Sequence, residues 1–275
     1  MSPVKIAILA AVLIGLADLV ACNDKDRDEQ QTSASQPVAG EQPAAQNPAK
    51  KPDADEGEEG EEGPATPAVA AAEQPAPQQT AGKQFVYNFD GDTLGQLPAK
   101  FHSAKTGGGA TEKWIVSADP TAPSKPNVVT QTSTDQTDYR FPLLISDEGS
   151  FKDLDLRVKF KADSGNIDRA GGLVFRLKDP NNYYIVRANA LENNYRLYHV
   201  VNGRRSQFAG ANLKVTSGEW HELRVEAVGN KITCYYDGSQ KIEATDDTFK
   251  DPGKVGLWTK ADSVTSFDDL KVVAK

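Results

Sequence analysis

From residue 85 onward, hydrophobic and polar residues form short runs that turn-forming residues separate. In the run 222–228, Leu223 and Val225 share one side while charged residues occupy the other, which is typical of a strand with one face in water. A dipeptide such as Asn202-Gly203 predicts a tight turn after a run. The pattern therefore predicts antiparallel strands joined by short turns.

Six runs of this kind are rich in β-branched and aromatic residues. They are 158–161, 173–177, 183–187, 195–201, 222–228 and 231–236. No stretch keeps a helical period of hydrophobic residues for three turns. The chain is therefore predicted to be all-β, a sandwich or barrel of antiparallel sheets. Cys234 shares one side of its run with Ile232 and Tyr236, which predicts a buried free thiol.

Aromatic residues and charge are distributed unevenly over the 275 residues. All 21 aromatic residues lie at or after Phe85. Residues 23–83 carry 13 acidic and 5 basic residues, whereas residues 84–275 carry 25 of each sign. The net charge of −8 thus belongs to a segment without aromatics, and the domain after it is neutral. A neutral domain of this kind argues against a nucleic-acid partner.

Residues 23–83 are predicted to be a disordered linker. They hold eight of the 16 prolines, together with repeated Ala, Gln and Glu. Without aromatic residues they cannot bury enough apolar surface to offset an ordering entropy of about 1–2 kcal/mol per residue. We expect a tether that lifts the domain 84–275 off its anchor. The alternative is that the glutamate run binds cations or a basic partner.

The first 22 residues have the order of a secretory signal, with Lys5 before an apolar run over 6–16 and small residues before Cys22. The run is too short for a membrane span, which takes about 20 apolar residues. Leu19-Val-Ala-Cys22 resembles the bacterial lipobox, whose cysteine is lipidated. The resemblance implies a lipoprotein anchored to a membrane through Cys22. The alternative is an ordinary signal peptide with a cysteine nearby.

Asn23 follows the predicted lipidation site. By resemblance to the sorting signals of enteric bacteria, the absence of aspartate there favours the outer membrane over the inner one. We therefore expect the domain to lie in the bacterial cell envelope, in the periplasm or at the cell surface.

A predicted hairpin carries the clearest family resemblance. Gly218-Glu-Trp-His-Glu-Leu-Arg-Val-Glu226, followed by Gly229-Asn-Lys-Ile-Thr-Cys-Tyr-Tyr-Asp-Gly238, resembles a hairpin of the concanavalin A-like lectin/glucanase superfamily. Laminin G-like domains and 3-keto-disaccharide hydrolase domains belong to this superfamily. Segments that look like the latter are 151–160, 170–176, 179–184, 255–258 and 267–272.

The resemblance covers nearly all of 85–273 and implies a jelly roll of two antiparallel sheets, one concave and one convex. It implies that Trp220 is a core residue. It is specific for the fold and weak for function, because this fold hosts lectins, hydrolases and adhesion modules.

The motifs for catalysis are not present in the domain. Glycoside hydrolysis needs two carboxylates placed across the scissile bond, and the Glu-x-Asp-x-x-Glu pattern of family 16 glucanases does not occur in 84–275. Asp153 and Asp155 share a strand face, but the resemblance places them on an outer strand, where we expect them to be solvated. The three histidines show no zinc-ligand spacing.

Calcium is the cofactor that the sequence favours. Asn88, Asp90 and Asp92 supply oxygen atoms at alternate positions near the first strand, and Asp268 does so near the last strand. Related domains often bind calcium where the terminal strands meet, so the resemblance implies Asp90 and Asp268 as ligands. Turn aspartates that face water are the alternative.

A sugar site should combine aromatic platforms with polar groups, because a sugar ring has apolar C–H faces and a polar rim. Alternation in three runs turns four suitable side chains away from the core, and we expect them to line the concave sheet. They are Arg176, Tyr183, Arg187 and Trp258. The alternative is a sheet that is partly covered and carries structural Arg–Asp pairs.

These observations predict a membrane-anchored, non-catalytic lipoprotein that binds a carbohydrate or glycoconjugate. The missing carboxylate motif, the lipobox and the long linker support this prediction. Two alternatives stay open. One is a glycoside hydrolase for disaccharide-like substrates, which rests on the family resemblance, and the other is a laminin G-like adhesion module.

Overall fold

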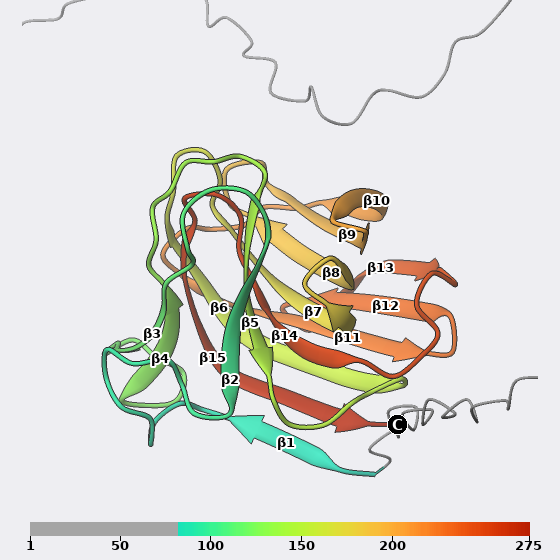
Figure 1. Ribbon diagram of the computed structural model, residues 1–275, viewed down its shortest axis with the longest axis horizontal. Coiled ribbons are helices and arrows are strands. Elements are labelled where there is room, and N and C mark those ends of the chain that lie inside the picture. Colours follow the sequence, from blue (N-terminus) through green and yellow to red (C-terminus); the bar gives the residue numbers. More distant parts are fainter. Residues whose placement is uncertain (1–81) are drawn as a thin grey trace, which may run out of the picture. The chain divides into compact units, whose positions relative to one another are not determined.

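The structure, a computed structural model, describes residues 82–275, which form fifteen β-strands and no helix (Figure 1). In this part of the chain, accordingly, there is no helix that is long and apolar enough to cross a membrane. The predicted signal sequence with Cys22 and the predicted linker up to residue 81 lie outside the described residues.

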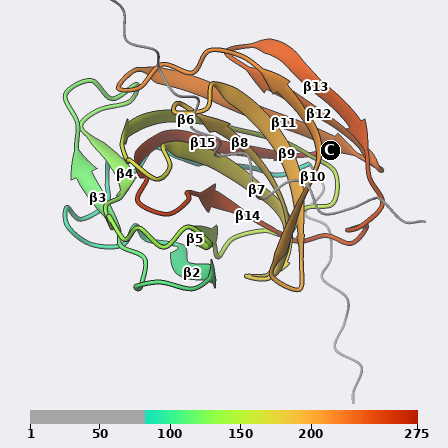
Figure 2. The ribbon, with the colours of Figure 1, turned by 90° about the horizontal axis from the view of Figure 1, so that it is seen from above.

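Two antiparallel sheets contain all the strands. The larger sheet has, in spatial order, β13 (Ser239–Thr245), β12 (Lys231–Tyr236), β11 (Trp220–Val228), β6 (Leu154–Ser164), β15 (Val264–Ala274), β4 (Asn127–Gln131) and β3 (Trp114–Ala118), with β1 (Gln84–Tyr87) also paired to β15. The smaller sheet has β10 (Arg204–Asn212), β9 (Asn194–Val201), β8 (Asn182–Asn189), β7 (Ala170–Asp179), β14 (Lys254–Trp258), β5 (Arg140–Ser146) and β2 (Phe101–Gly107). Figure 2 shows them as layers, with β6, β11 and β12 in one and β14, β5 and β2 in the other. The predicted all-β jelly-roll sandwich is confirmed.

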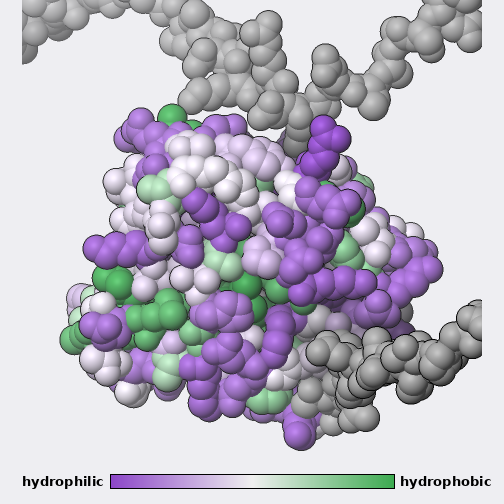
Figure 3. Space-filling view, in the orientation of Figure 1, coloured by the Kyte–Doolittle hydropathy of each residue, from purple (hydrophilic) through white to green (hydrophobic). Residues whose placement is uncertain are grey.

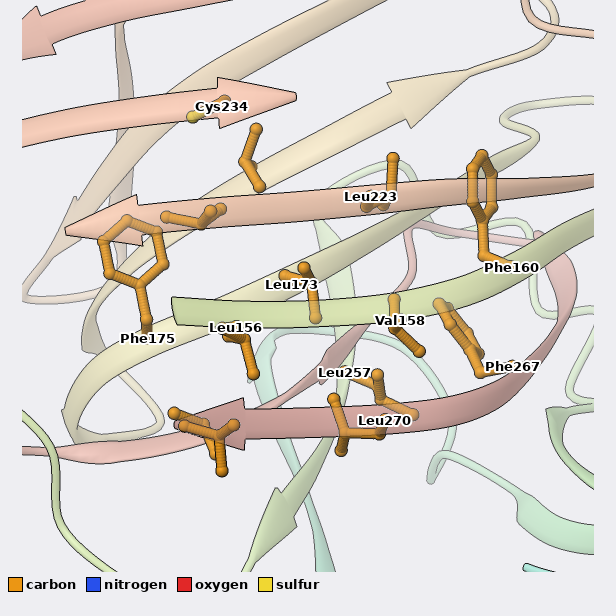
Figure 4. Packing of buried hydrophobic residues seen from close by; sticks show 14 of the residues in the cluster. Leu156, Val158, Phe160, Leu173, Phe175, Leu223, Cys234, Leu257, Phe267 and Leu270 are labelled. Carbon is orange, nitrogen blue, oxygen red and sulfur yellow. The ribbon is translucent and has the colours of Figure 1, made fainter. Parts of the chain in front are cut away.

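The main hydrophobic core lies between the two sheets. Figure 4 shows Val158, Leu223 and Phe267 of the larger sheet close to Leu173 and Leu257 of the smaller one. All five are fully buried, and full burial of such side chains contributes about 1.5–3 kcal/mol each. The alternation predicted for the run 222–228 is therefore confirmed, because Leu223, Val225 and Ala227 face this core.

Two further predictions about single residues have different outcomes. Cys234 is buried and forms no disulfide within the described residues, and burial raises the pKa of its thiol. Trp220 was expected in the core, and this is wrong. It lies partly exposed at the start of β11, where its indole Nε1 donates to Thr121 Oγ1 (3.2 Å) and Lys161 Nζ lies 5.1 Å from its ring.

On the outer side of the larger sheet, Asp155 is not solvated as expected. It is buried under Arg224, whose Nε and Nη2 lie 2.9 and 2.6 Å from its two carboxylate oxygens. The neighbouring Asp153 accepts a hydrogen bond from the Gly229 backbone N–H (2.9 Å). Both carboxylates therefore take part in contacts that join neighbouring segments of the larger sheet.

The smaller sheet curls until its two sides touch across its outer face. Tyr139, just before β5, donates its hydroxyl to the Gly203 carbonyl (2.7 Å) and accepts the Arg205 backbone N–H (2.9 Å), although β5 and β10 are far apart in the sheet order. Thr106 Oγ1 in β2 similarly lies 2.9 Å from the Tyr183 hydroxyl in β8. The outer face is therefore concave, as the resemblance implies.

A second hydrophobic cluster fills this concave face. Its members are Phe141, Leu143, Ile145, Ala170, Val174, Leu177, Tyr183, Ile185, Tyr198, Val200 and Trp258. The strands of the smaller sheet thus bury hydrophobic side chains on both faces, which explains why β5 reads as a nearly continuous apolar run rather than as an alternating one.

Candidate functional site

The four side chains predicted to line the concave sheet are all buried. Trp258 and Tyr183 are 0% exposed, Arg176 is 1% exposed and Arg187 is 4% exposed. The expectation that they face solvent is therefore wrong. Three of them lie on the concave face, and Arg176 does not.

Arg176 lies at a bulge that interrupts the pairing of β7 with β8, and its φ of +46° turns the chain there. Its guanidinium donates to three backbone carbonyls, those of Lys152 (2.7 Å), Phe249 (3.0 Å) and Gly229 (2.6 Å). Burial lowers the pKa of this group. A cavity of about 190 Å³ lies beside it, lined also by Lys250. Because all three side-chain nitrogens of Arg176 donate hydrogen bonds, this residue connects three separate segments of the chain.

Trp258 and Tyr183 form part of the floor of the concave face. The Trp258 ring stacks on Phe141 with centroids 5.3 Å apart. Burial raises the pKa of Tyr183, whose hydroxyl is held by Thr106. The alternating pattern assigns Trp258 and Tyr183 to the correct face of the sheet. Neighbouring side chains on that same face, however, cover both rings. Neither ring is a free platform for a sugar.

Above this floor lies a group of five charged residues, which we call the concave-face cluster. Its members are Asp168, Arg187, Glu192, Arg205 and Lys260. Loops and turns at one end of the sheet supply Asp168, Glu192 and Lys260, while β8 and β10 supply the two arginines. Glu192 is exposed, and Arg205 and Lys260 are partly exposed, so the cluster opens to solvent at its rim.

Arg187 connects the cluster to β9. Its Nη1 donates to Asn194 Oδ1 (2.5 Å) and its Nη2 to the Tyr198 hydroxyl (2.9 Å), with Glu192 Oε2 also 2.9 Å from Nη2. Burial alone would lower the pKa of Arg187, but Tyr198, Asp168 and Glu192 hold it above its ordinary value. Its Nε is buried without a hydrogen-bond partner.

Asp168 is the buried carboxylate of the cluster. Asn189 Nδ2 donates to its Oδ1 (3.0 Å), and Lys260 Nζ lies 3.4 Å from its Oδ2, which accepts no hydrogen bond. Burial raises the pKa of Asp168, and the positive charges of Arg187 and Lys260 oppose that rise. Lys260 also pairs with the exposed Asp138 (2.9 Å).

Arg205 crosses the floor of the concave face. Its guanidinium carbon lies 4.8 Å from the ring centroid of Phe141, 4.5 Å from that of Tyr198 and 5.9 Å from that of Trp258. Such contacts are attractive because the face of an aromatic ring is electronegative. The arginine therefore covers the apolar floor and presents a positive charge at its centre.

Comparison with protein families decides the classification of this domain. The model of the 3-keto-alpha-glucoside-1,2-lyase-like domain family matches residues 84–273. The chain belongs to this family. The match spans every strand of both sheets, so the concave face described above is part of the family domain.

Several solved structures are similar to this chain. The carbohydrate-binding module CBM66 of Bacillus subtilis is 22% identical over 62% of this chain and 94% of that chain, with a TM-score of 0.50. The exoplasmic/lumenal domain of VIP36, in a form bound to Ca²⁺ and mannose, is 11% identical over 72% of this chain and 92% of that chain, with a TM-score of 0.49. A native glycosidic hydrolase is 13% identical over 71% of this chain and 97% of that chain, with a TM-score of 0.45. No curated protein matches.

The calcium ligands expected in this lyase-like domain are engaged by protein donors. Asp90 Oδ1 accepts the Asn127 backbone N–H (3.1 Å). Asp268 is fully buried, and its two oxygens accept the backbone N–H and the hydroxyl of Ser124 (2.7 and 2.8 Å). Among residues 82–275, no three His, Cys, Asp or Glu side chains are grouped to hold a metal. These residues do not fit a calcium site.

Sequence reasoning missed most of the concave-face cluster. Asp168 and Glu192 lie between strands, where alternation assigns no face, and Arg205 lies in β10, whose sequence has no alternating pattern. Arg187 was the only member of the cluster among the four candidate side chains that the alternating pattern assigned to this face. Charged residues that come together only because a sheet is curved show no recognisable pattern along the sequence.

Proposed function

We propose that the domain binds a saccharide on its concave face, at the concave-face cluster. The observation that carries this proposal is the pair of buried polar atoms without hydrogen-bond partners, Asp168 Oδ2 and Arg187 Nε. Buried polar groups without partners are rare, because each costs about 1–3 kcal/mol. A sugar hydroxyl both donates and accepts, so one hydroxyl can serve a carboxylate and another a guanidinium.

The chemistry of the relatives supports a sugar ligand. The family name refers to an oxidised glucoside, and the CBM66 structure shares the fold and is named as a carbohydrate-binding module. The cluster is open at Glu192, Lys260 and Arg205 and closed below by the hydrophobic floor. A ligand that enters from the rim would contact charged side chains first.

A glycan array probed with the full chain would identify ligands, and calorimetry on a bound glycan would test the site. Asp168→Asn and Glu192→Gln should each weaken binding about tenfold, the effect of losing one charged hydrogen bond. Lys231→Gln is the matched control, because this exposed lysine pairs with Glu243 (3.1 Å) on the other sheet. Equal affinities for all variants would contradict the proposal.

The family name supplies a second candidate, elimination from a 3-keto-glucoside. The C3 carbonyl makes the C2 proton acidic; its removal with cleavage of the C1–O bond forms a C1=C2 double bond and releases the aglycone as an alcohol. Asp168 favours this candidate, because its Oδ2 accepts no hydrogen bond and lies beside the Lys260 ammonium. The carboxylate would take the C2 proton and then give it to the departing C1 oxygen, so that the aglycone leaves as an alcohol, and the ammonium would stabilise the enolate oxygen.

Incubation with a 3-keto-glucoside separates the two candidates. Release of the aglycone, abolished by Asp168→Asn and retained in Lys231→Gln, would support the lyase. Retention of the sugar without turnover would support the binding module. The predicted hydrolysis of disaccharide-like substrates would instead give a saturated sugar, which mass spectrometry distinguishes by one water molecule.

We further propose that the domain is held at the outer membrane by lipidation of Cys22. The lipobox and the following acidic, proline-rich segment support this arrangement, and several acyl chains together give firm anchoring. Cys22→Ser should release the protein from membranes into the soluble fraction. Unchanged fractionation of that variant would end the lipoprotein proposal and leave the saccharide site untouched.

A further inference from the structure

We propose that the saccharide carries a carboxylate group and that Arg205 binds it. This inference rests on the saccharide site proposed above and names its ligand class as acidic sugars, such as hexuronates. The feature that suggests it is Arg205 itself, whose guanidinium forms no ion pair within the concave-face cluster.

The other two cations of the cluster have anionic partners. Arg187 pairs with Glu192 (2.9 Å), and Lys260 pairs with Asp138 (2.9 Å) and Asp168 (3.4 Å). The Arg205 guanidinium has no carboxylate within 4.0 Å among the described residues, and its side chain donates no hydrogen bond to them. Arg205 is therefore the one cation of the cluster that lacks a carboxylate partner among the described residues.

The position of Arg205 is fixed although its charge is not paired. Three aromatic rings hold its guanidinium, at 4.5–5.9 Å from their centroids, and Tyr139 holds its backbone N–H. Its Nη1 is buried without a partner, while the residue as a whole is partly exposed. A fixed, partly exposed guanidinium loses little side-chain entropy when it binds an anion.

The shape of the Arg205 guanidinium favours a carboxylate over other anions. The planar guanidinium presents parallel N–H bonds that match the two oxygens of a carboxylate. Within the cluster, the carboxylates of Asp168 and Glu192 are already paired with Lys260 and Arg187, so they repel an incoming carboxylate less than free acids would. A sulfate ester offers related oxygens on a tetrahedral group, and the experiment separates the two.

The test uses the full chain on an array of matched oligosaccharides in three forms: neutral, with one C6 oxidised to a carboxylate, and with the same C6 sulfated. The carboxylate form should bind about tenfold or more tightly than the neutral form. Arg205→Met, which keeps an unbranched chain over the rings, should remove that preference. Arg204→Gln, an exposed neighbour in β10, should keep it.

Each result decides between the proposals. Equal binding of neutral and carboxylate forms, unchanged by Arg205→Met, overturns the acidic ligand and leaves the saccharide site standing. Preference for the sulfate form over the carboxylate form also overturns it. Failure to bind any form removes the saccharide site itself. Melting curves of Arg205→Met, together with its binding to neutral forms, show that a lost preference is not a loss of folding.

Discussion

Asp268 shows how a single buried carboxylate affects the stability of the whole domain. Burial raises its pKa to about 6, above the ordinary 3.8, and hydrogen bonds from Ser124 oppose this rise. The folded protein therefore keeps a proton that the unfolded chain releases. The stabilisation that comes from this retained proton is fully present below about pH 4 and is lost as the pH rises through 6. The free energy of unfolding changes by about 3 kcal/mol over this range.

We predict that Asp268→Asn removes this component of the pH dependence. Urea unfolding at pH values between 4 and 7 should show a smaller loss of stability with rising pH in the variant than in the original protein. Asp251→Asn, at an exposed position in the loop before β14, is the control and should follow the original protein. Parallel curves for all three proteins would show that Asp268 does not hold a raised pKa.

At the same scale, the sequence determines which face a residue takes but not whether that face is covered. Alternation correctly placed Trp258 and Tyr183 away from the main core, yet both are fully buried by the second cluster. It failed for Arg176 because a bulge in β7 changes the register there. The structural alternative, a covered sheet with ion pairs, describes the concave face better than the exposed platform.

At the scale of elements, the strands with clear alternation were predictable and the edge strands were not. β11 and β12 lie inside the larger sheet with one face on the core, and their pattern shows it. β10 and β2 end the smaller sheet, and both are largely polar and partly exposed. An edge strand has less surface to bury, so its sequence carries a weaker pattern.

The Tyr139 hydroxyl contributes to the closure of the smaller sheet. Tyr139 joins the segment before β5 to the β9–β10 turn by two hydrogen bonds. We predict that Tyr139→Phe destabilises the domain by about 1–2 kcal/mol, because two hydrogen bonds are lost. Amide exchange at Arg205 should become faster, and ligand affinity should fall because Arg205 is no longer fixed.

Hydrogen-exchange mass spectrometry and urea unfolding would measure these effects. Tyr235→Phe on β12 is the matched control, because the Tyr235 hydroxyl makes no hydrogen bond with the described residues and its ring stays available to Arg224 (4.5 Å). If Arg205 exchanged at the same rate in Tyr139→Phe as in the original protein, the contact would not hold the sheet closed.

At the scale of the molecule, the described residues form two hydrophobic clusters, one between the sheets and one on the concave face. The hydrophilic face in Figure 3 shows only small separate groups of hydrophobic residues, and the exposed large ones, such as Val86 and Leu94, are few. The domain thus buries its apolar surface within itself. The family match over 84–273 has the same extent.

We therefore predict that a fragment of residues 84–275 folds with the melting temperature of the full chain. β1 begins at Gln84 and pairs with β15 through Tyr87, so a start at this point keeps every strand and loses only the hydrogen bond from the Ala274 N–H to the Lys83 carbonyl (3.0 Å). Removal of β1, by starting after Asn88, should lower the melting temperature, because Tyr87 is a core residue bonded to Ser146 (3.1 Å). Differential scanning calorimetry of the full chain and both fragments measures this. A fragment 84–275 that melts about 5 °C or more below the full chain, a loss of 1–2 kcal/mol for a domain of this size, would show that earlier residues contribute to the fold.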